Sequence, residues 1–195
     1  MQSSLFYRSR KDKIERLRVP YEAGVTLDSM ANVGNDHALG MELSGQFIVN
    51  KWWNLNVNGN VYYYKVVNNI NAGGKEETST NYDITVNNLL RICKNTRIQL
   101  DGNFVGPSVT TQGRSDSFWF VNLAIRQQWF GSNLQSTLSF RDIFNSARYK
   151  NDITTPNLES VTHIRPKFPV ITLSISYTFN HFKRSSQNSR DNRDL

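Results

Sequence analysis

Apolar and polar residues alternate along most of the chain, and a period of two predicts β-strands. The clearest segment is 53–63, where one face is apolar and the other is rich in asparagine. The apolar face carries Trp53, Leu55, Val57, Gly59, Val61 and Tyr63, and the other carries Asn54, Asn56, Asn58, Asn60 and Tyr62. The helical period of 3.6 residues is hard to find elsewhere. The pattern therefore predicts an all-β protein.

The alternation marks eight strands, at 5–8, 37–49, 53–63, 82–92, 97–104, 119–129, 134–140 and 171–179. Their connections are of two kinds. Short turns at 50–51, 93–95 and 131–133 are rich in Asn, Lys, Gly and Ser, as hairpins prefer. Long links at 9–36, 67–79, 108–116 and 142–163 alternate with them. Because alternation resumes after residues 20–24, the first link is expected to be a hairpin that extends beyond the rest of the sheet.

Short turns at one end and long loops at the other are typical of an outer-membrane β-barrel. A soluble sandwich or jelly roll can show a similar pattern. Two features favour the barrel. The strands run to about 10 residues, twice the common soluble strand and suited to a tilted membrane crossing. The second feature is the placement of the aromatic residues.

Trp52 and Trp53 lie beside a short turn, whereas Tyr62, Tyr63 and Tyr64 lie beside the following long link. Ten residues of tilted strand span about 25 Å, the height of the apolar band of a barrel. Since Trp and Tyr favour membrane interfaces, we expect these residues and Trp129 to be interface aromatics. The alternative is that they form the core of a soluble sheet.

The asparagine-rich face also favours an outer-membrane barrel. The chain has 23 Asn, a poor strand former whose amide is costly to bury in a dry core. Successive asparagines at 54, 56, 58 and 60 fit a wet lumen, although a solvent-facing sheet would also supply water.

Composition removes several other classes of protein. Mean hydropathy is −0.53, and no apolar run approaches the roughly 20 residues of a spanning helix. The net charge of +7 is concentrated in residues 8–18 and beyond 181, so the expected core has no basic face for nucleic acid. The single Cys93 excludes an internal disulfide and a zinc module. The N-terminus shows no secretory signal, so we expect either an internal location or a longer parent chain.

The sequence suggests no catalytic, metal or cofactor site, and we expect that the protein is not an enzyme. His37, His163 and His181 lie far apart without a nearby acid or nucleophile, and Cys93 falls at a turn. Gly73-Gly74-Lys75 is not followed by Ser or Thr, so a phosphate loop is not expected. Two charged segments are interpreted as structural or surface features rather than as catalytic sites. Arg141 and Asp142 are expected to cap a strand and order the following loop, and 11–18 either attracts anionic lipid headgroups or is a solvated hairpin.

Three groups of residues carry a resemblance to a known family. They are Ser4-Leu5-Phe6-Tyr7-Arg8 through Lys13-Ile14-Glu15-Arg16, Asn32-Val33-Gly34-Asn35 with Gly40-Met41-Glu42-Leu43, and Arg141-Asp142-Ile143-Phe144-Asn145. In order and spacing they resemble the C-terminal strands of the large outer-membrane β-barrel proteins of Bacteroidetes, relatives of TonB-dependent receptors. The segment 165–180, ending Ser-Tyr-Thr-Phe-Asn, is similar to the last strand of that family.

The resemblance implies a transmembrane antiparallel barrel in the cell outer membrane, with residues 1–182 as the C-terminal part of a parent of about 22 strands. It implies uptake of an unidentified nutrient. The implied partners are outer-membrane lipid, the barrel-insertion machinery, an N-terminal barrel and plug of the same parent chain, and a TonB-type energy coupler that acts on the plug. Tyr177 and Phe179 look like the family's C-terminal assembly signal. Residues 183–195 are polar and expected to be disordered.

Two alternatives remain open. One is a stand-alone eight-stranded barrel, an anchor or adhesin, which requires the strand at 5–8 to pair with the strand at 170–179. The other is a soluble β-barrel carrier with its apolar face inside and its asparagines outside. Solubility without detergent would favour the carrier, and a detergent-folded monomer that shifts on unheated gels would favour the small barrel.

Overall fold

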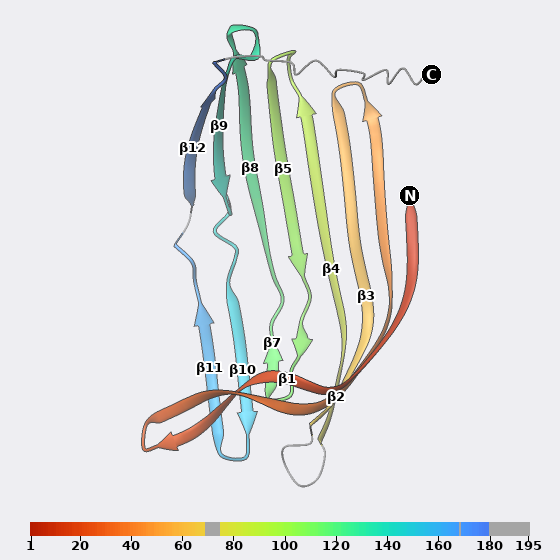
Figure 1. The fold of residues 1–195 in the computed structure, drawn as a ribbon, viewed down its shortest axis with the longest axis vertical. Helices are drawn as coiled ribbons and strands as arrows, with labels where there is room; N and C mark the ends of the chain where they lie inside the picture. The colour runs from red at the N-terminus through yellow and green to blue at the C-terminus, as the bar shows by residue number, and fades with distance from the viewer. Residues whose placement is uncertain (69–74, 168, 180–195) are drawn as a thin grey trace, which may run out of the picture.

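The computed structural model describes residues 1–68, 75–167 and 169–179, which form two antiparallel sheets (Figure 1). The main sheet contains eight strands in the order β1-β2-β3-β4-β5-β8-β9-β12. Their bounds are β1 Gln2–Glu22, β2 Val25–Asn50, β3 Trp53–Asn68, β4 Lys75–Arg91, β5 Thr96–Val105, β8 Phe118–Trp129, β9 Leu134–Arg141 and β12 Val170–Tyr177. The all-β class predicted from the alternation is confirmed. Among these residues, no helix is long and apolar enough to span a membrane.

A second, four-stranded sheet has the order β11-β10-β7-β6 and is built from two hairpins inserted between strands of the main sheet. The strands are β6 Ser108–Val109, β7 Gly113–Ser115, β10 Tyr149–Thr155 and β11 Leu158–Ile164. The sequence pattern predicts links at these places rather than strands. β6 and β7 are too short for an alternation to be recognised, and β10 joins β7 through a pairing distant in sequence.

The connections separate into two ends, as expected (Figure 1). Residues 51–52, residues 92–95 and the short 3₁₀ turn η1 (Phe130–Ser132) join neighbouring strands at one end. Gly131 in η1 has φ 66°, a conformation that glycine adopts without steric cost. Both inserted hairpins and the turn of the β1–β2 hairpin lie at the opposite end. We call these the short-turn end and the long-loop end.

β1 and β2 form a hairpin longer than the other strands, which confirms the prediction of an extended first hairpin. Residue 22 pairs with residue 25 around the turn, where Gly24 has φ 76°. Partway along, the register shifts between Arg10 and Lys13, with Asp12 at φ 51° and Gly34 at φ 139°. This bulge bends the hairpin, because an extra residue on one strand increases the local twist. Beyond the bend the hairpin crosses the long-loop end of the sheet (Figure 1).

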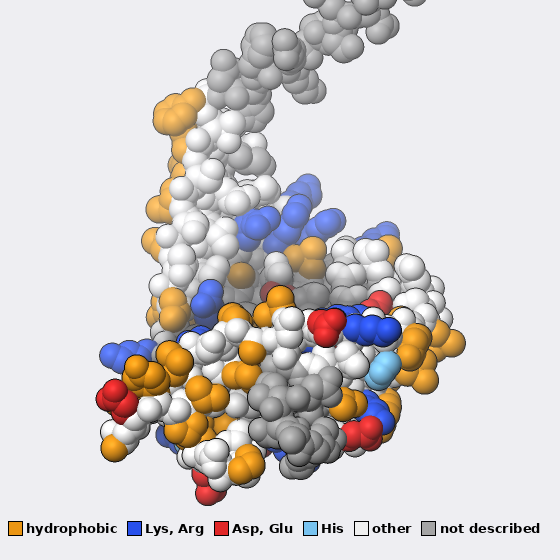
Figure 2. All heavy atoms as spheres, turned by 60° about the horizontal axis from the view of Figure 1, so that its bottom comes forward, with side chains coloured by type: hydrophobic (Ala, Val, Ile, Leu, Met, Phe, Trp, Pro, Cys, Tyr) orange, Lys and Arg blue, Asp and Glu red, His pale blue; other side chains and the backbone are white. Residues whose placement is uncertain are grey.

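The two faces of the main sheet have the chemistry that the alternation predicts. Register places the odd-numbered residues of β3, from Trp53 to Tyr63, on the same face as Tyr82, Ile84 and Val86. We call this apolar face the outer face. The asparagines at 54, 56 and 58 lie on the other, inner face, with Asn87 and Thr85. In Figure 2 hydrophobic side chains follow the outer margin of the sheet and its inner side is hollowed.

A small core lies on the inner face at the long-loop end. Ala38, Tyr64, Val66 and Val109 are buried together, and Val109 comes from β6. In contrast, many of the large apolar residues of the outer face are exposed; Leu173, for example, is 64% exposed. An apolar band of this extent needs an apolar environment, which lipid supplies.

One glycine on the inner face is needed for close packing. In register, Gly40 lies between Phe6 on β1 and Tyr62 on β3, whose ring centroids are 6.1 Å apart. A Cβ atom at Gly40 would lie 2.3 Å from the Cβ of Tyr62. Glycine therefore allows the two rings to meet above the β2 backbone.

The main sheet is not closed into a barrel. Within the described residues β1 pairs only with β2, and β12 pairs only with β9. A stand-alone barrel would require β1 to pair with β12, and no such pairing is present among these residues.

Candidate functional site

Four of the expected interface aromatics lie toward the outer face or at its edge. Tyr63 is exposed on the outer face near the long-loop end. Trp52 and Trp53 stack at the short-turn end, with ring centroids 6.1 Å apart. Trp129 is exposed at the same end, and its Nε1 donates a hydrogen bond to Ser136 Oγ at 3.0 Å. Two levels of aromatic residues thus border the apolar band, and their contact with the membrane interface remains a prediction.

The prediction that Tyr62 and Tyr64 are interface residues is wrong, because both lie on the inner face. The Tyr64 side chain is 6% exposed and packs against Ala38 and Val66. Tyr62 meets Tyr64 edge-on, with ring centroids 6.4 Å apart. The cause is the period of two: only Tyr63 of the three consecutive tyrosines can point outward.

Tyr177 and Phe179 lie at the end of β12. Their rings meet edge-on with centroids 4.7 Å apart, and both are exposed. Tyr177 shares the outer face with Ile175 and Leu173. Their role as an assembly signal remains a prediction.

The strongest polar cluster lies inside the long-loop end, around Asp36 of β2. Asp36 is completely buried. Its carboxylate accepts hydrogen bonds from Arg10 Nε at 3.0 Å and from the Tyr64 hydroxyl at 3.0 Å. Arg10 makes a second contact through its terminal nitrogen, so the pair is bidentate. The cluster therefore joins β1, β2 and β3 across one end of the inner face.

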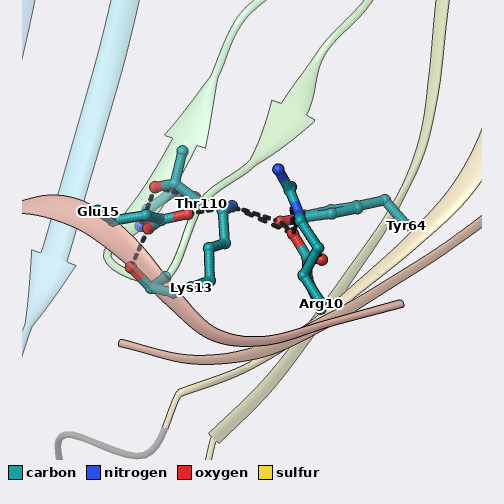
Figure 3. Close-up of polar contacts among 8 residues, drawn as sticks. Arg10, Lys13, Glu15, Tyr64 and Thr110 are labelled. Atoms are coloured by element: carbon teal, nitrogen blue, oxygen red, sulfur yellow. Dashed lines mark hydrogen bonds and ion pairs between the residues drawn. The ribbon is translucent and has the colours of Figure 1, made fainter. Parts of the chain in front are cut away.

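Lys13 extends this cluster toward the inserted hairpins (Figure 3). Its ammonium donates to the Tyr64 hydroxyl at 2.7 Å and forms an ion pair with Glu15. It also lies 3.4 Å from Asp36 Oδ2. Glu15 in turn accepts a hydrogen bond from the Thr111 hydroxyl, which belongs to the turn between β6 and β7. We call Arg10, Lys13, Glu15, Asp36, Tyr64 and Thr111 the latch cluster.

The charges of the latch cluster stabilise one another. Burial would raise the pKa of Asp36, but hydrogen bonds from Arg10 and Tyr64 outweigh it, and the pKa lies below its ordinary value. The pKa of Glu15 is likewise lowered, because hydrogen bonds from Lys13 and Thr111 outweigh burial. For Lys13, burial lowers the pKa, but the partners Glu15 and Tyr64 raise it more. All three groups are therefore charged at neutral pH.

A second set of contacts holds the far part of the β1–β2 hairpin. The backbone N–H of Arg18 donates to the Gln112 side chain at 2.8 Å, and Gln112 Nε2 donates back to the Arg18 carbonyl at 2.9 Å. Arg16 and Arg18 both form ion pairs with Asp28 across the hairpin. Much of the positive charge expected to attract lipid headgroups is therefore paired within the protein.

Asp142 orders the start of the long link after β9, as the sequence predicts. It is 1% exposed, and its carboxylate accepts the backbone N–H groups of Ser146 at 3.0 Å and Ala147 at 2.9 Å. Its own N–H donates to the Asn122 side chain at 3.0 Å. The next residue, Ile143, lies in the turn after β9, and its N–H donates to the carbonyl of Val121 on β8.

The remaining candidates lie apart from one another. His37 contacts the Tyr7 hydroxyl through Nδ1 at 3.0 Å, His163 lies in β11, and Cys93 is an exposed thiol at a turn. His181, Gly73, Gly74 and the segment 183–195 lie outside the described residues. In the part of the chain that the structure describes, no three His, Cys, Asp or Glu residues are placed to hold a metal ion.

The middle of the inner face presents amides and carboxylates to a shallow cavity of about 270 Å³. Its lining includes Glu42, Asp83, Asn58 and Asn60. Such a wall can hydrogen-bond water or a polar solute at many points. The alternation predicts the asparagines of this wall but not the latch cluster, because Glu15 and Thr111 are 96 residues apart. The sequence feature that indicates the latch cluster is Asp36, an aspartate at the start of an alternating strand.

Comparison with known proteins identifies a family. A family model described as the outer membrane protein beta-barrel family matches residues 1–177. No curated protein and no solved structure matches the chain.

Proposed function

The chain belongs to the outer membrane protein β-barrel family, which places it in the outer membrane, and from this premise we propose that it forms the C-terminal wall of a TonB-dependent-type receptor for nutrient uptake. In this proposal the main sheet is one arc of a larger barrel, with the outer face against lipid and the inner face lining a lumen. Preceding strands and a plug from the same parent chain complete the structure.

The observation that carries the proposal is the combination of an open sheet and a polar inner face. Eight strands closed on themselves leave an interior wide enough only for side chains. Here β1 and β12 each have one unpaired edge among the described residues, and an exposed edge readily pairs with another strand. An amide-lined wall with a cavity suits a wide lumen better than a side-chain-filled one.

The long-loop end fits the extracellular side of such a receptor. Barrels of this membrane have short periplasmic turns and longer extracellular loops. The β1–β2 hairpin and the β6–β7 turn meet there through Glu15 and Thr111. Two long loops tied to each other give a defined surface on which a solute can first bind.

The size of the mature outer-membrane protein tests this proposal. Antibodies against the 75–90 segment should detect, in purified outer membranes, a protein several times heavier than 22.5 kDa. Removal of the inner-membrane energy coupler should abolish uptake of its nutrient while leaving the amount of protein unchanged. A protein of about 22.5 kDa that shifts on unheated gels would instead support the stand-alone anchor or adhesin.

A further inference from the structure

Three arginines form a row on the inner face at the short-turn end. In register, Arg91 of β4 lies opposite Arg97 of β5, and Arg97 lies opposite Arg126 of β8. Directly opposed like charges on neighbouring strands destabilise a sheet. Strand pairing therefore does not explain why three arginines lie side by side.

Among the residues that the structure describes, no Asp or Glu lies at this end. The segments 46–56, 87–99, 122–138 and 173–179, which form the short-turn ends of the strands, contain no Asp or Glu. Among the described residues, the ion pairs involve none of these three arginines. The nearest inner-face acid along β5 is Asp101, which lies two residues beyond Gln99 and accepts a hydrogen bond from its Nε2.

A cavity lies directly on the row. It has a volume of about 160 Å³ and is lined by Leu89, Arg97, Gln99, Ala124, Arg126 and Thr137. Two guanidinium groups, one amide and one hydroxyl can thus donate hydrogen bonds into a single space. A planar guanidinium binds a carboxylate or phosphate through two parallel hydrogen bonds, which gives both charge and geometry.

We propose that Arg97 and Arg126, with Arg91 beside them, bind a carboxylate or phosphate group of a small solute in the lumen. The site faces away from the apolar outer face, so a lipid headgroup is not its ligand. This inference rests on the proposed function for its assignment of the inner face to a lumen, and it adds the class of solute. A solute that enters from the long-loop end then passes the acidic and amide-lined cavity at Glu42 and Asp83 before it reaches the three arginines.

The test is calorimetric titration of the full chain, extracted from outer membranes in detergent, at low salt. Inorganic pyrophosphate and citrate are the anionic probes, and sucrose is the neutral control. Both anions should bind, and the R97Q/R126Q variant should bind them at least tenfold more weakly. The R8Q/R114Q variant removes the same charge at the long-loop end and should bind within twofold of wild type.

Three results would overturn the proposal: no binding of either anion, equal weakening in both double variants, or binding of an acidic peptide without binding of the small anions. The last result would assign the row to a polypeptide segment instead.

A thermal measurement separates ligand binding from a structural role. Without anion, R97Q/R126Q should unfold at a higher temperature than wild type, because the repulsion is relieved, and pyrophosphate should raise only the wild-type value. A lower unfolding temperature with unchanged anion binding would contradict the proposal. Neither measurement depends on uptake. If the anions bind but energy-coupled transport is absent, the receptor function is refuted and the anion site stands.

Discussion

The Tyr64 hydroxyl donates a hydrogen bond to Asp36 at 3.0 Å and accepts one from Lys13 at 2.7 Å. This one phenol therefore connects the buried carboxylate of β2 to the ammonium group of β1. Through Glu15 and Thr111 the same chain of contacts reaches the β6–β7 turn. The extended hairpin is thus held against the inner side of the sheet by paired charges that lie beside the small apolar core.

Substitution of Asp36 by Asn should destabilise the protein by about 2 to 4 kcal/mol, because it removes the buried partner of Arg10 and Lys13. The figure is at the low end for a broken buried pair, since the Arg10 side chain is 45% exposed and can gain water. The free energy of unfolding, measured by urea titration in lipid vesicles, gives the value. Asp28→Asn is the matched control and should cost much less, because the Arg16 and Arg18 ion pairs lie at the surface.

Stability should fall in acid through the latch cluster. The folded-state pKa values of Asp36 and Glu15 lie below their ordinary values of 3.8 and 4.5. Their stabilisation is therefore complete above those ordinary values and is lost as pH falls through the lower folded-state pKa values. Unfolding titrations between pH 7 and pH 2 should show this loss, and a D36N variant should show a smaller one. The same acid loss in wild type and D36N would place the responsible carboxylates elsewhere.

The loop after β9 should open when the Asp142 side chain is removed. Asp142→Ala leaves the N–H groups of Ser146 and Ala147 without their acceptor, at a cost of about 1 to 3 kcal/mol. Limited proteolysis should then cut the segment 143–149 faster than in wild type. Asp116→Ala is the control, because the Asp116 carboxylate forms a 3.5 Å ion pair with Lys150 at the surface and the substitution keeps its backbone hydrogen bond. Equal cutting rates for wild type and D142A would show that other contacts order this loop.

The faces of the sheet could be predicted from sequence, because a period of two depends on neighbours only. The alternation at Asn54 to Tyr63 gave the correct faces once register was known. The grouping of three consecutive tyrosines wrongly predicts that Tyr62 and Tyr64 face the membrane, because the period of two turns both of them to the inner face. The latch cluster could not be predicted, since the bulge at Asp12 reorients Lys13 and the partner Thr111 lies on a distant turn.

A charge on the outer face should cost much more than a charge on the inner face. Leu173→Arg on β12 should destabilise the protein by about 2 to 4 kcal/mol near the bilayer midplane. Ser174→Arg, one residue along and on the inner face beside Thr137, should cost much less. Folding titrations in lipid vesicles measure both values. Equal costs would show that the two faces are wrongly assigned.

The orientation of the sheet in the membrane is tested most directly by spin labels on neighbouring residues. In a Cys93→Ser background, single cysteines at Val57, Asn58, Leu173 and Ser174 are labelled in the protein folded in lipid. We expect oxygen, which is concentrated in lipid, to relax the labels at 57 and 173, and a water-soluble nickel complex to relax those at 58 and 174. The opposite pattern, or equal access to the nickel complex at all four positions, would contradict an outer-membrane barrel wall with its apolar face in lipid.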